Sequence, residues 1–362
     1  MNKKLKIMLC LFSIALIVFI GISMGPLKNL QNDEIEITEN IDSELTIVGF
    51  SQLGSESDWR TANTKSIQNA LTKKNGFSLI FSNGRQSQEN QIKAIRSFIF
   101  QEVDYIVIAP VVETGWDTVL EEAKQAGIPV IIVDRMIKTR DQSLFVAYVG
   151  TDKYEEGMEA GKWLEKYLKE QKNKNNASQE KEQIETAPKE KSVQEEDNIN
   201  IVVLEGTENS TAQIGRSKGF EDIARNNKNW NILAHEDGDF TKAKGKEIMK
   251  KYLKRFDDID VLVSQNDDMT FGAIEAIQEA GLTCGVNGDI TIISFDAVLE
   301  AFDKMEAGLI NVDIECNPLQ GQMIAAIIEC LEKGEKVDKE SYVYGRIFEA
   351  KNASKDRIGR SY

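Results

Sequence analysis

Short apolar runs rich in Val and Ile recur along the chain and alternate with longer amphipathic stretches. The runs predict strands at Leu45–Phe50, Phe77–Phe81, Tyr105–Ala109, Val130–Val133, Phe145–Val149, Ile201–Leu204, Ile232–Ala234, Val261–Ser264, Ile290–Ser294 and Asn311–Glu315. The stretches between them predict helices at Thr61–Asn75, Ser87–Gln101, Trp116–Gly127, Glu155–Leu168, Gln213–Asn226, Lys242–Phe256, Met269–Gly281 and Val298–Gly308. Continuous apolar strands that alternate with helices are typical of parallel sheets covered on both faces. The pattern therefore predicts an α/β chain of two doubly wound units.

The first 27 residues have a different pattern. Lys3, Lys4 and Lys6 precede an uncharged apolar run from Ile7 to Leu27. This arrangement is typical of an export signal, and the run is long enough for either a cleaved signal peptide or an uncleaved membrane anchor. Residues 28–44 are polar and acidic and are interpreted as a tether. Both alternatives place the body of the protein outside the cytoplasm, anchored to the membrane at the cell surface or periplasmic.

A second polar stretch interrupts the α/β pattern at residues 170–198. It is rich in Lys, Glu, Gln and Asn and has only Ile184 and Val193 as large apolar side chains. Such a segment cannot bury enough apolar surface to offset its ordering entropy. It is interpreted as a disordered insertion in the second unit, after a helix that ends near Lys169.

Charge and composition narrow the function. The chain has 44 Lys and Arg, 59 Asp and Glu, a formal charge of −15 and one histidine, His235. An acidic chain without a basic patch in its body argues against nucleic-acid binding. One histidine excludes HExxH zinc sites and other multi-histidine metal centres, and the cysteines form no CxxC motif and cannot make a complete disulfide framework. We therefore expect no metal and no cofactor.

The polar residues at the strand ends suggest a ligand site. In an open parallel sheet the ligand crevice lies at the carboxyl ends of the strands. The residues expected there are Ser51, Glu56, Trp59, Arg60, Asp134, Arg135, Arg216, Asn266, Asp267, Asp296 and Glu315. Carboxylates accept hydrogen bonds from adjacent hydroxyls and guanidinium groups donate to them, so a ring of such groups suits a polyol. Taken singly, an Asp at a strand end could be only a helix cap and Trp59 only a core residue.

Several stretches together resemble a known family. They are Phe50–Asn63, Gln88–Phe98, Ile108–Trp116, Val133–Arg135, Gly238–Lys246 and Asn266–Met269. They resemble the type I periplasmic sugar-binding proteins of ABC importers, in the ribose and galactose group and most closely its galactofuranose-binding branch. The chain departs from the family pattern at residues 170–198 and at Ala297, where the family usually has Gly, and Cys10 does not lie in a lipobox.

The resemblance implies two Rossmann-like lobes joined by a hinge of three chain crossings. The first lobe would comprise residues 45–150 and 317–337, and the second residues 151–316 and 338–362. It implies capture of a monosaccharide, such as galactose, galactofuranose or a ribose-like sugar, between the lobes and delivery to the permease subunits, by a protein monomeric in its soluble part. The family's sugar contacts fall on Trp59, Arg60, Asp134, Arg135, Arg216, Asn266 or Asp267, Asp296 and Glu315, with Ser51 and Glu56 as additions.

Three other functions compete with this interpretation. A membrane-tethered sugar sensor that signals to a histidine kinase would use the same scaffold, and the apolar N-terminus is compatible with it. A sugar-processing enzyme could use the carboxylates of Asp267, Asp296 and Glu315, but no metal motif or nucleophile elbow accompanies them. A repressor would need a helix-turn-helix before Leu45, where an export signal stands instead.

Overall fold

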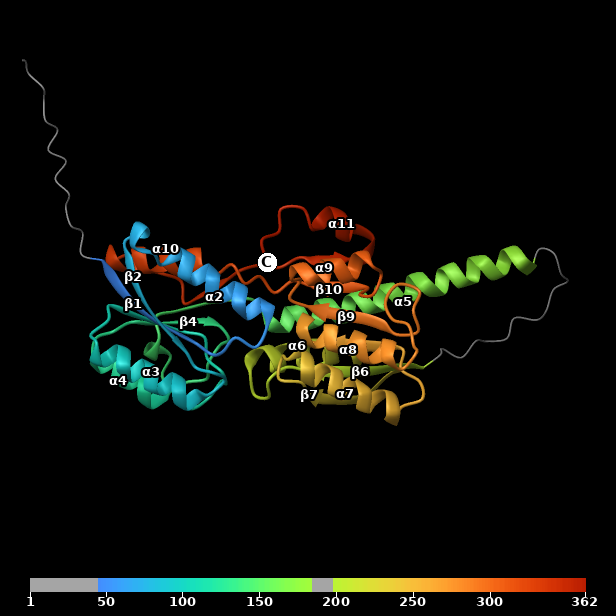
Figure 1. The fold of residues 1–362 in the computed structure, drawn as a ribbon, viewed down its shortest axis with the longest axis horizontal. Helices are drawn as coiled ribbons and strands as arrows, with labels where there is room; N and C mark the ends of the chain where they lie inside the picture. Colours follow the sequence, from blue (N-terminus) through green and yellow to red (C-terminus); the bar gives the residue numbers. More distant parts are fainter. Residues whose placement is uncertain (1–44, 184–197) are drawn as a thin grey trace, which may run out of the picture. The chain divides into compact units, whose positions relative to one another are not determined.

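The computed structural model describes residues 45–183 and 198–362. These residues form two parallel-rich sheets of six strands, and each sheet is covered by helices on its two faces (Figure 1). This confirms the predicted α/β class and its two doubly wound lobes. The N-terminal apolar run and tether lie outside the described residues.

The first lobe is built around a sheet with the strand order β11-β5-β4-β3-β1-β2, in which every pairing is parallel. Its elements are β1 (Thr46–Gln52), α2 (Asp58–Ala70), β2 (Phe77–Asn83), α3 (Gln88–Phe100), β3 (Tyr105–Ile108), α4 (Asp117–Gln125), β4 (Val130–Asp134), β5 (Ala147–Gly150), α10 (Gly321–Glu332) and β11 (Glu340–Tyr342). α3 and α4 pack on one face through Phe98 and Leu120. α2 and α10 pack on the other through Ile67 and Ile324.

The second lobe repeats this plan with the strand order β12-β10-β9-β8-β6-β7. Its elements are α5 (Lys153–Gln183), β6 (Ile199–Glu205), α6 (Thr211–Ala224), β7 (Trp230–Asp237), α7 (Lys242–Arg255), β8 (Val261–Ser264), α8 (Asp267–Glu279), β9 (Thr291–Phe295), α9 (Leu299–Glu306), β10 (Val312–Ile314), β12 (Ile347–Glu349) and α11 (Ala353–Asp356). β12 pairs antiparallel with β10, and the other pairings are parallel. Trp163 and Phe220 bring α5 and α6 onto one face. Met249, Ile274 and Phe302 bring α7, α8 and α9 onto the other.

Three segments of chain connect the two sheets. They are residues 151–152 after β5, residues 315–320 before α10, and residues 343–346 between β11 and β12. The predicted boundary at 337/338 is wrong for the last segment, because β11 pairs with β5 in the first sheet and extends that lobe to Tyr342. A strand of three residues is too short to be recognised from its apolar pattern.

The interpretation of residues 170–198 as a disordered insertion is also wrong in its first part. α5 does not end near Lys169 but continues to Gln183, beyond the second sheet (Figure 1). Lys, Glu and Gln favour helix, and Lys169–Glu165 and Lys166–Glu170 form ion pairs one turn apart. Residues 184–197 lie outside the described residues.

α5 and α6 pack unusually closely because glycines line their contact. A Cβ atom added at Gly157 would overlap the backbone carbonyl of Arg216, and one at Gly219 would overlap the carbonyl of Tyr154. Only residues without a side chain permit two helix backbones to approach in this way. The contact determines where α6 holds Arg216 relative to the first turn of α5.

Candidate functional site

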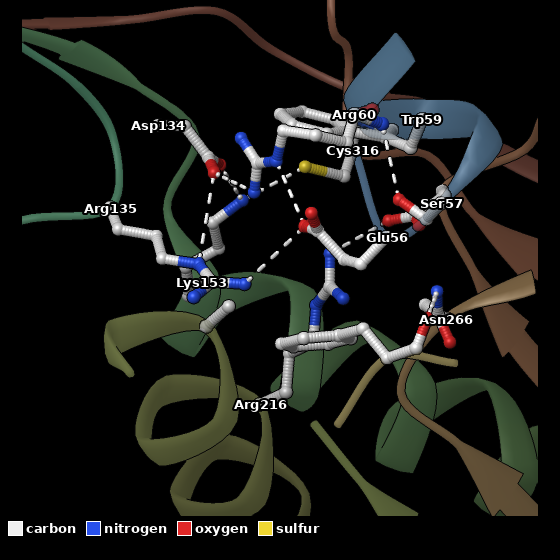
Figure 2. A pocket seen from close by; sticks show the side chains of 13 residues that line it. Glu56, Ser57, Trp59, Arg60, Asp134, Arg135, Lys153, Arg216, Asn266 and Cys316 are labelled. Carbon is white, nitrogen blue, oxygen red and sulfur yellow. Dashed lines mark hydrogen bonds and ion pairs between the residues drawn. The ribbon is translucent and has the colours of Figure 1, made fainter. Parts of the chain in front are cut away.

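The predicted polar residues gather in a hollow with about 280 Å³ of empty space (Figure 2). It is lined by Glu56, Ser57, Trp59, Arg60, Asp134, Arg135, Lys153, Ala212, Arg216, Phe240, Asn266, Asp296 and Cys316. These residues come from both lobes and from the second connecting segment. Eight of the residues expected at the strand ends are among them: Glu56, Trp59, Arg60, Asp134, Arg135, Arg216, Asn266 and Asp296.

The start of α2 supplies the first group of side chains. α2 begins at Asp58, earlier than the predicted Thr61, because the Ser57 hydroxyl caps it by accepting a hydrogen bond from the Arg60 amide. The cap places Trp59 and Arg60 in the first turn. The Arg60 guanidinium then lies 2.9 Å from the Glu56 carboxylate and 2.8 Å from the Asp134 carboxylate.

The first turn of α5 continues this set of charges into the second lobe. The Lys153 ammonium lies 3.2 Å from Asp134 and 3.8 Å from Glu156. Glu156 in turn is 2.7 Å from Arg216, whose other guanidinium nitrogen is 3.2 Å from Asp296. Acidic and basic side chains thus alternate in one chain, which we call the ion-pair chain: Glu56, Arg60, Asp134, Lys153, Glu156, Arg216 and Asp296.

Burial and charge act in opposite directions on these groups. Burial alone would raise the pKa of Asp134, but the positive charges of Lys153, Arg60 and Arg135 outweigh it and lower that pKa. Glu156 follows the same pattern, since Lys153 and Arg216 lower its pKa against the effect of burial. At Asp296 burial prevails over Arg216 and raises the pKa well above its ordinary value. Asp296 therefore holds a proton more readily than an exposed aspartate.

Arg135 lies beside the ion-pair chain without a close acidic partner. Its nearest carboxylate oxygens, on Glu56 and Asp134, are 3.9 Å away. One guanidinium nitrogen donates to the Val111 carbonyl, and the group lies 5.1 Å from the centre of the Phe240 ring. Burial, followed by the charge of Arg60, lowers the pKa of Arg135 to about 10. Arg135 is therefore held in place at a cost in electrostatic energy.

Three buried side-chain atoms of residues that line the hollow have no hydrogen-bond partner in the described part of the chain. They are Oε2 of Glu56, Nη1 of Arg60 and Nε of Arg135. Buried donors and acceptors are nearly always paired, because leaving one unpaired costs about 1–3 kcal/mol. One acceptor and two donors on side chains that line one hollow are what a ligand with several hydroxyl groups could satisfy.

Trp59 forms one wall of the hollow. Its indole N–H donates to the Cys316 carbonyl, and its side chain is 3% exposed. The Arg60 guanidinium lies 4.8 Å and the Lys153 ammonium 5.7 Å from the centre of the ring. Trp59 therefore unites the two roles considered for it, since it packs with the second-lobe core and also lines the hollow.

Three of the residues expected at the site do not line the hollow. Ser51 is fully buried in β1 and lies within hydrogen-bonding distance of Gln91. The Asp267 carboxylate accepts from the Ser294 hydroxyl and the Val298 amide. Glu315 accepts from the Arg360 guanidinium, the Tyr362 hydroxyl and the Arg346 amide. A side chain that follows a strand can point into the interior of its own lobe as well as into the ligand crevice.

Sequence reasoning missed Ser57, Lys153, Ala212, Phe240 and Cys316. Lys153 and Cys316 interact directly, with the Lys153 ammonium donating to the Cys316 sulfur at 2.8 Å. Burial raises the pKa of the Cys316 thiol to about 12. Lys153 stands three residues after β5 and Cys316 two residues after β10. The strand-end rule would have reached both had it been applied to the connecting segments.

Two turns at the site have backbone in the left-handed region. The φ angle is 63° at Asp134, 108° at Asp296 and 58° at Ala297. Residues other than glycine seldom adopt such angles, and they cluster at functional sites where the surroundings hold them. The two aspartates that face the hollow are therefore held in unfavourable backbone conformations.

None of the helices in residues 45–183 and 198–362 combines the length and hydrophobicity of a membrane span. In those same ranges no group of three or more His, Cys, Asp or Glu side chains could hold a metal ion.

Comparison with known proteins shows the family of the chain. Residues 48–336 match the family described as the periplasmic binding protein domain. The chain is 40% identical over 292 residues to the galactofuranose-binding protein YtfQ of Escherichia coli (strain K12), covering 80% of this chain and 82% of YtfQ.

Solved structures of sugar-bound proteins are also similar to this chain. The periplasmic binding protein of the arabinose ABC transporter from Shewanella sp. ANA-3, bound to α- and β-L-arabinofuranose, is 40% identical with a TM-score of 0.76, over 86% of this chain and 94% of that one. A protein from Mycobacterium smegmatis in complex with β-D-fucofuranose is 39% identical with a TM-score of 0.74, over 85% and 93% of the two chains. The chain therefore belongs to the type I periplasmic sugar-binding proteins.

Proposed function

We propose that this protein is the extracytoplasmic solute-binding component of a sugar ABC importer, and that it captures a monosaccharide in its furanose form. The hollow between the lobes is the binding site. The proposal is carried by Glu56, Arg60 and Arg135, which line one hollow with Trp59 and each have a buried polar atom without a partner among residues 45–183 and 198–362.

The chemistry of these groups matches a neutral sugar. The Glu56 oxygen would accept from a hydroxyl, while Arg60 and Arg135 would donate to hydroxyl or ring oxygens. Trp59 offers an apolar surface for the C–H groups of the sugar. The remaining charges are already paired within the ion-pair chain, so the site does not require a charged ligand.

The relatives favour a five-membered sugar ring. The curated relative is named for galactofuranose, and the two related structures contain arabinofuranose and fucofuranose. Each of these proteins is about 40% identical to this chain over most of its length. A compact furanose is therefore the ligand that we infer for the hollow.

Binding would be coupled to movement of the lobes. Glu56, Arg60, Asp134 and Arg135 belong to the first lobe, whereas Arg216, Asn266 and Asp296 belong to the second. A sugar that contacts both sets favours the arrangement in which they face each other, since a ligand shifts an equilibrium only through contacts that differ between its states. The closed form would then be recognised by the permease subunits. No chemical step is needed, which agrees with the binding role of the relatives.

The test is a calorimetric titration of the purified protein with five sugars in turn: L-arabinose, D-galactose, D-fucose, D-ribose and D-fructose. We expect saturable binding of at least one of these sugars. The ring size is then read from the anomeric carbon signal of the bound sugar labelled with ¹³C at C1. A bound pyranose would overturn the furanose assignment. If none of the five sugars binds, the sugar-binding proposal fails.

A further inference from the structure

We propose that Asp267, Asp313 and Arg360 act as positioning residues that hold the sugar-facing carboxylate of Asp296 in place. This inference rests on the proposed function, because it explains how one of the binding groups is set. None of the three residues lines the hollow. They act on the turn Asp296–Ala297–Val298 that follows β9, which we call the β9 turn.

The β9 turn is an unfavourable piece of backbone. Asp296 and Ala297 have φ angles of 108° and 58°, in a region that favours glycine. Ala297 is fully buried, so the turn cannot relax into solvent. A turn of this kind persists only where surrounding groups fix it.

Hydrogen bonds from three directions fix it. The Ala297 amide donates to Oδ1 of Asp313 at 3.1 Å, and the Val298 amide donates to Oδ2 of Asp267 at 2.9 Å. From the C-terminal segment, the Arg360 guanidinium donates to the Ala297 carbonyl at 2.7 Å. Each peptide group on either side of the Ala297 Cα is therefore held by a charged or ionisable side chain.

Asp267, Asp313 and Arg360 together form what we call the clamp. The carboxyl groups of Asp267 and Asp313 interact directly with each other. Both are fully buried, and Oδ2 of Asp313 has no donor among the described residues. Burial and the facing carboxyl group raise the pKa of Asp267 well above its ordinary value, and burial raises that of Asp313 as well. One proton shared by the pair gives the free oxygen a partner and avoids two adjacent negative charges.

Two further ionisable groups face the pair, and Asp296 has a raised pKa of its own. Asp296 faces it from the end of β9 and Arg360 from the C-terminal segment. The hydroxyls of Ser294 and Thr270 are 2.7 Å apart, and Ser294 also donates to Asp267. Because both carboxyl pKa values are raised, the pair keeps its proton to higher pH than exposed aspartates do, and losing it places two negative charges side by side under the β9 turn. Sugar affinity should therefore fall as the pH rises.

The experiment compares Asp313→Asn and Asp313→Leu with the unmodified chain. The Asn amide can donate to Asp267 and its oxygen can accept from Ala297, so Asp313→Asn should retain affinity and weaken its fall with rising pH. Asp313→Leu cannot accept from Ala297, and its Kd should rise about tenfold or more at neutral pH. Asp289→Asn is the matched control, since Asp289 is exposed and bonds Thr283 in another turn of the same lobe.

Amide hydrogen exchange of Ala297 and Val298, measured without sugar, keeps this inference separate from the proposed function. Exchange at Ala297 should accelerate in Asp313→Leu and stay slow in Asp313→Asn and Asp289→Asn. Unchanged exchange in Asp313→Leu, or exchange at Ala297 that is as fast in Asp313→Asn as in Asp313→Leu, would overturn the clamp. If exchange responds as expected while no sugar binds the unmodified chain, the clamp stands and the sugar-binding proposal fails.

Discussion

The Lys153 ammonium lies 3.2 Å from the Asp134 carboxylate and joins the two lobes through one buried ion pair. Asp134 ends β4 in the first lobe, and Lys153 begins α5 in the second. Within the ion-pair chain this is the link that crosses from one lobe to the other. Burial alone would lower the pKa of Lys153, but Cys316, Glu156 and Asp134 raise it, so the ammonium stays charged.

Replacing Lys153 should therefore damage both stability and binding. Lys153→Met leaves Asp134 with Arg60 and Glu156 with Arg216, so the loss should be smaller than for an isolated buried pair. We expect the free energy of unfolding to fall by about 2 kcal/mol and the sugar Kd to rise about tenfold. Denaturant unfolding and calorimetric titration measure the two effects. Lys162→Met, on the exposed side of the same helix, is the control and should change neither.

Replacing Arg135 should raise the stability of the fold while it removes sugar binding. Its pKa is lowered to about 10 because burial and the charge of Arg60 disfavour its charged form, so the charge destabilises the folded state at neutral pH. Arg135→Met should raise the free energy of unfolding by about 1 kcal/mol and abolish sugar binding. Thermal unfolding and titration test this pair of effects.

Arg96→Met provides the comparison for Arg135, since Arg96 pairs with Glu122 on the surface of the same lobe. It should leave sugar binding intact. A destabilised Arg135→Met that still binds sugar would show that Arg135 serves the fold and not the site.

Asp268 should make stability depend on pH. Its carboxylate accepts from the Asp58 amide of the other lobe, and burial, followed by the nearby acids Asp58, Glu56 and Glu300, raises its pKa to about 7. An acid whose pKa is higher in the folded state stabilises the protein when protonated. Its contribution is therefore present at acidic pH and lost as the pH rises through about 7.

The melting temperature of the unmodified chain, measured from acidic to mildly alkaline pH, should fall more steeply than that of Asp268→Asn. Asp267, Asp296 and Asp313 have raised pKa values and act in the same direction, so the difference between the two proteins is the relevant quantity. Identical pH profiles would mean that Asp268 does not titrate in this range.

Glu315 provides a test of the binding role predicted from its position. It is 6% exposed and accepts hydrogen bonds from Arg346, Arg360 and Tyr362, all outside the hollow. Glu315→Gln keeps an oxygen that can accept from Arg360, so it should lower the free energy of unfolding by about 2 kcal/mol and raise the sugar Kd by only a few-fold, through Arg360 and the β9 turn. A rise in Kd of tenfold or more by titration, without loss of stability, would instead place Glu315 in the binding site.

The strands and most of the site could be predicted because one physical rule applies to both. Asp134, Arg135 and Asp296 follow runs of buried Val and Ile, and parallel strands bring their carboxyl ends to one edge. The rule does not say which way a side chain turns. Asn266 and Asp267 are consecutive at the start of α8, yet Asn266 lines the hollow and Asp267 binds the Val298 amide.

What could not be predicted depends on tertiary contacts or on weak local signals. Lys153 has the pattern of an exposed lysine at a helix start, and only the packing of the connecting segments buries it. The extension of α5 to Gln183 has little apolar surface, so a search for periodic hydrophobic residues does not detect it. Helix propensity and ion pairs one turn apart would have indicated it.

The close contact of α5 with α6 has a thermodynamic consequence. Because Gly157 and Gly219 bring the two backbones together, Lys153, Glu156 and Arg216 are carried by what is mechanically one body. The side of the site contributed by these helices is therefore already ordered before a sugar arrives. Little conformational entropy remains to be lost there on binding, so more of the energy of each hydrogen bond can appear as affinity.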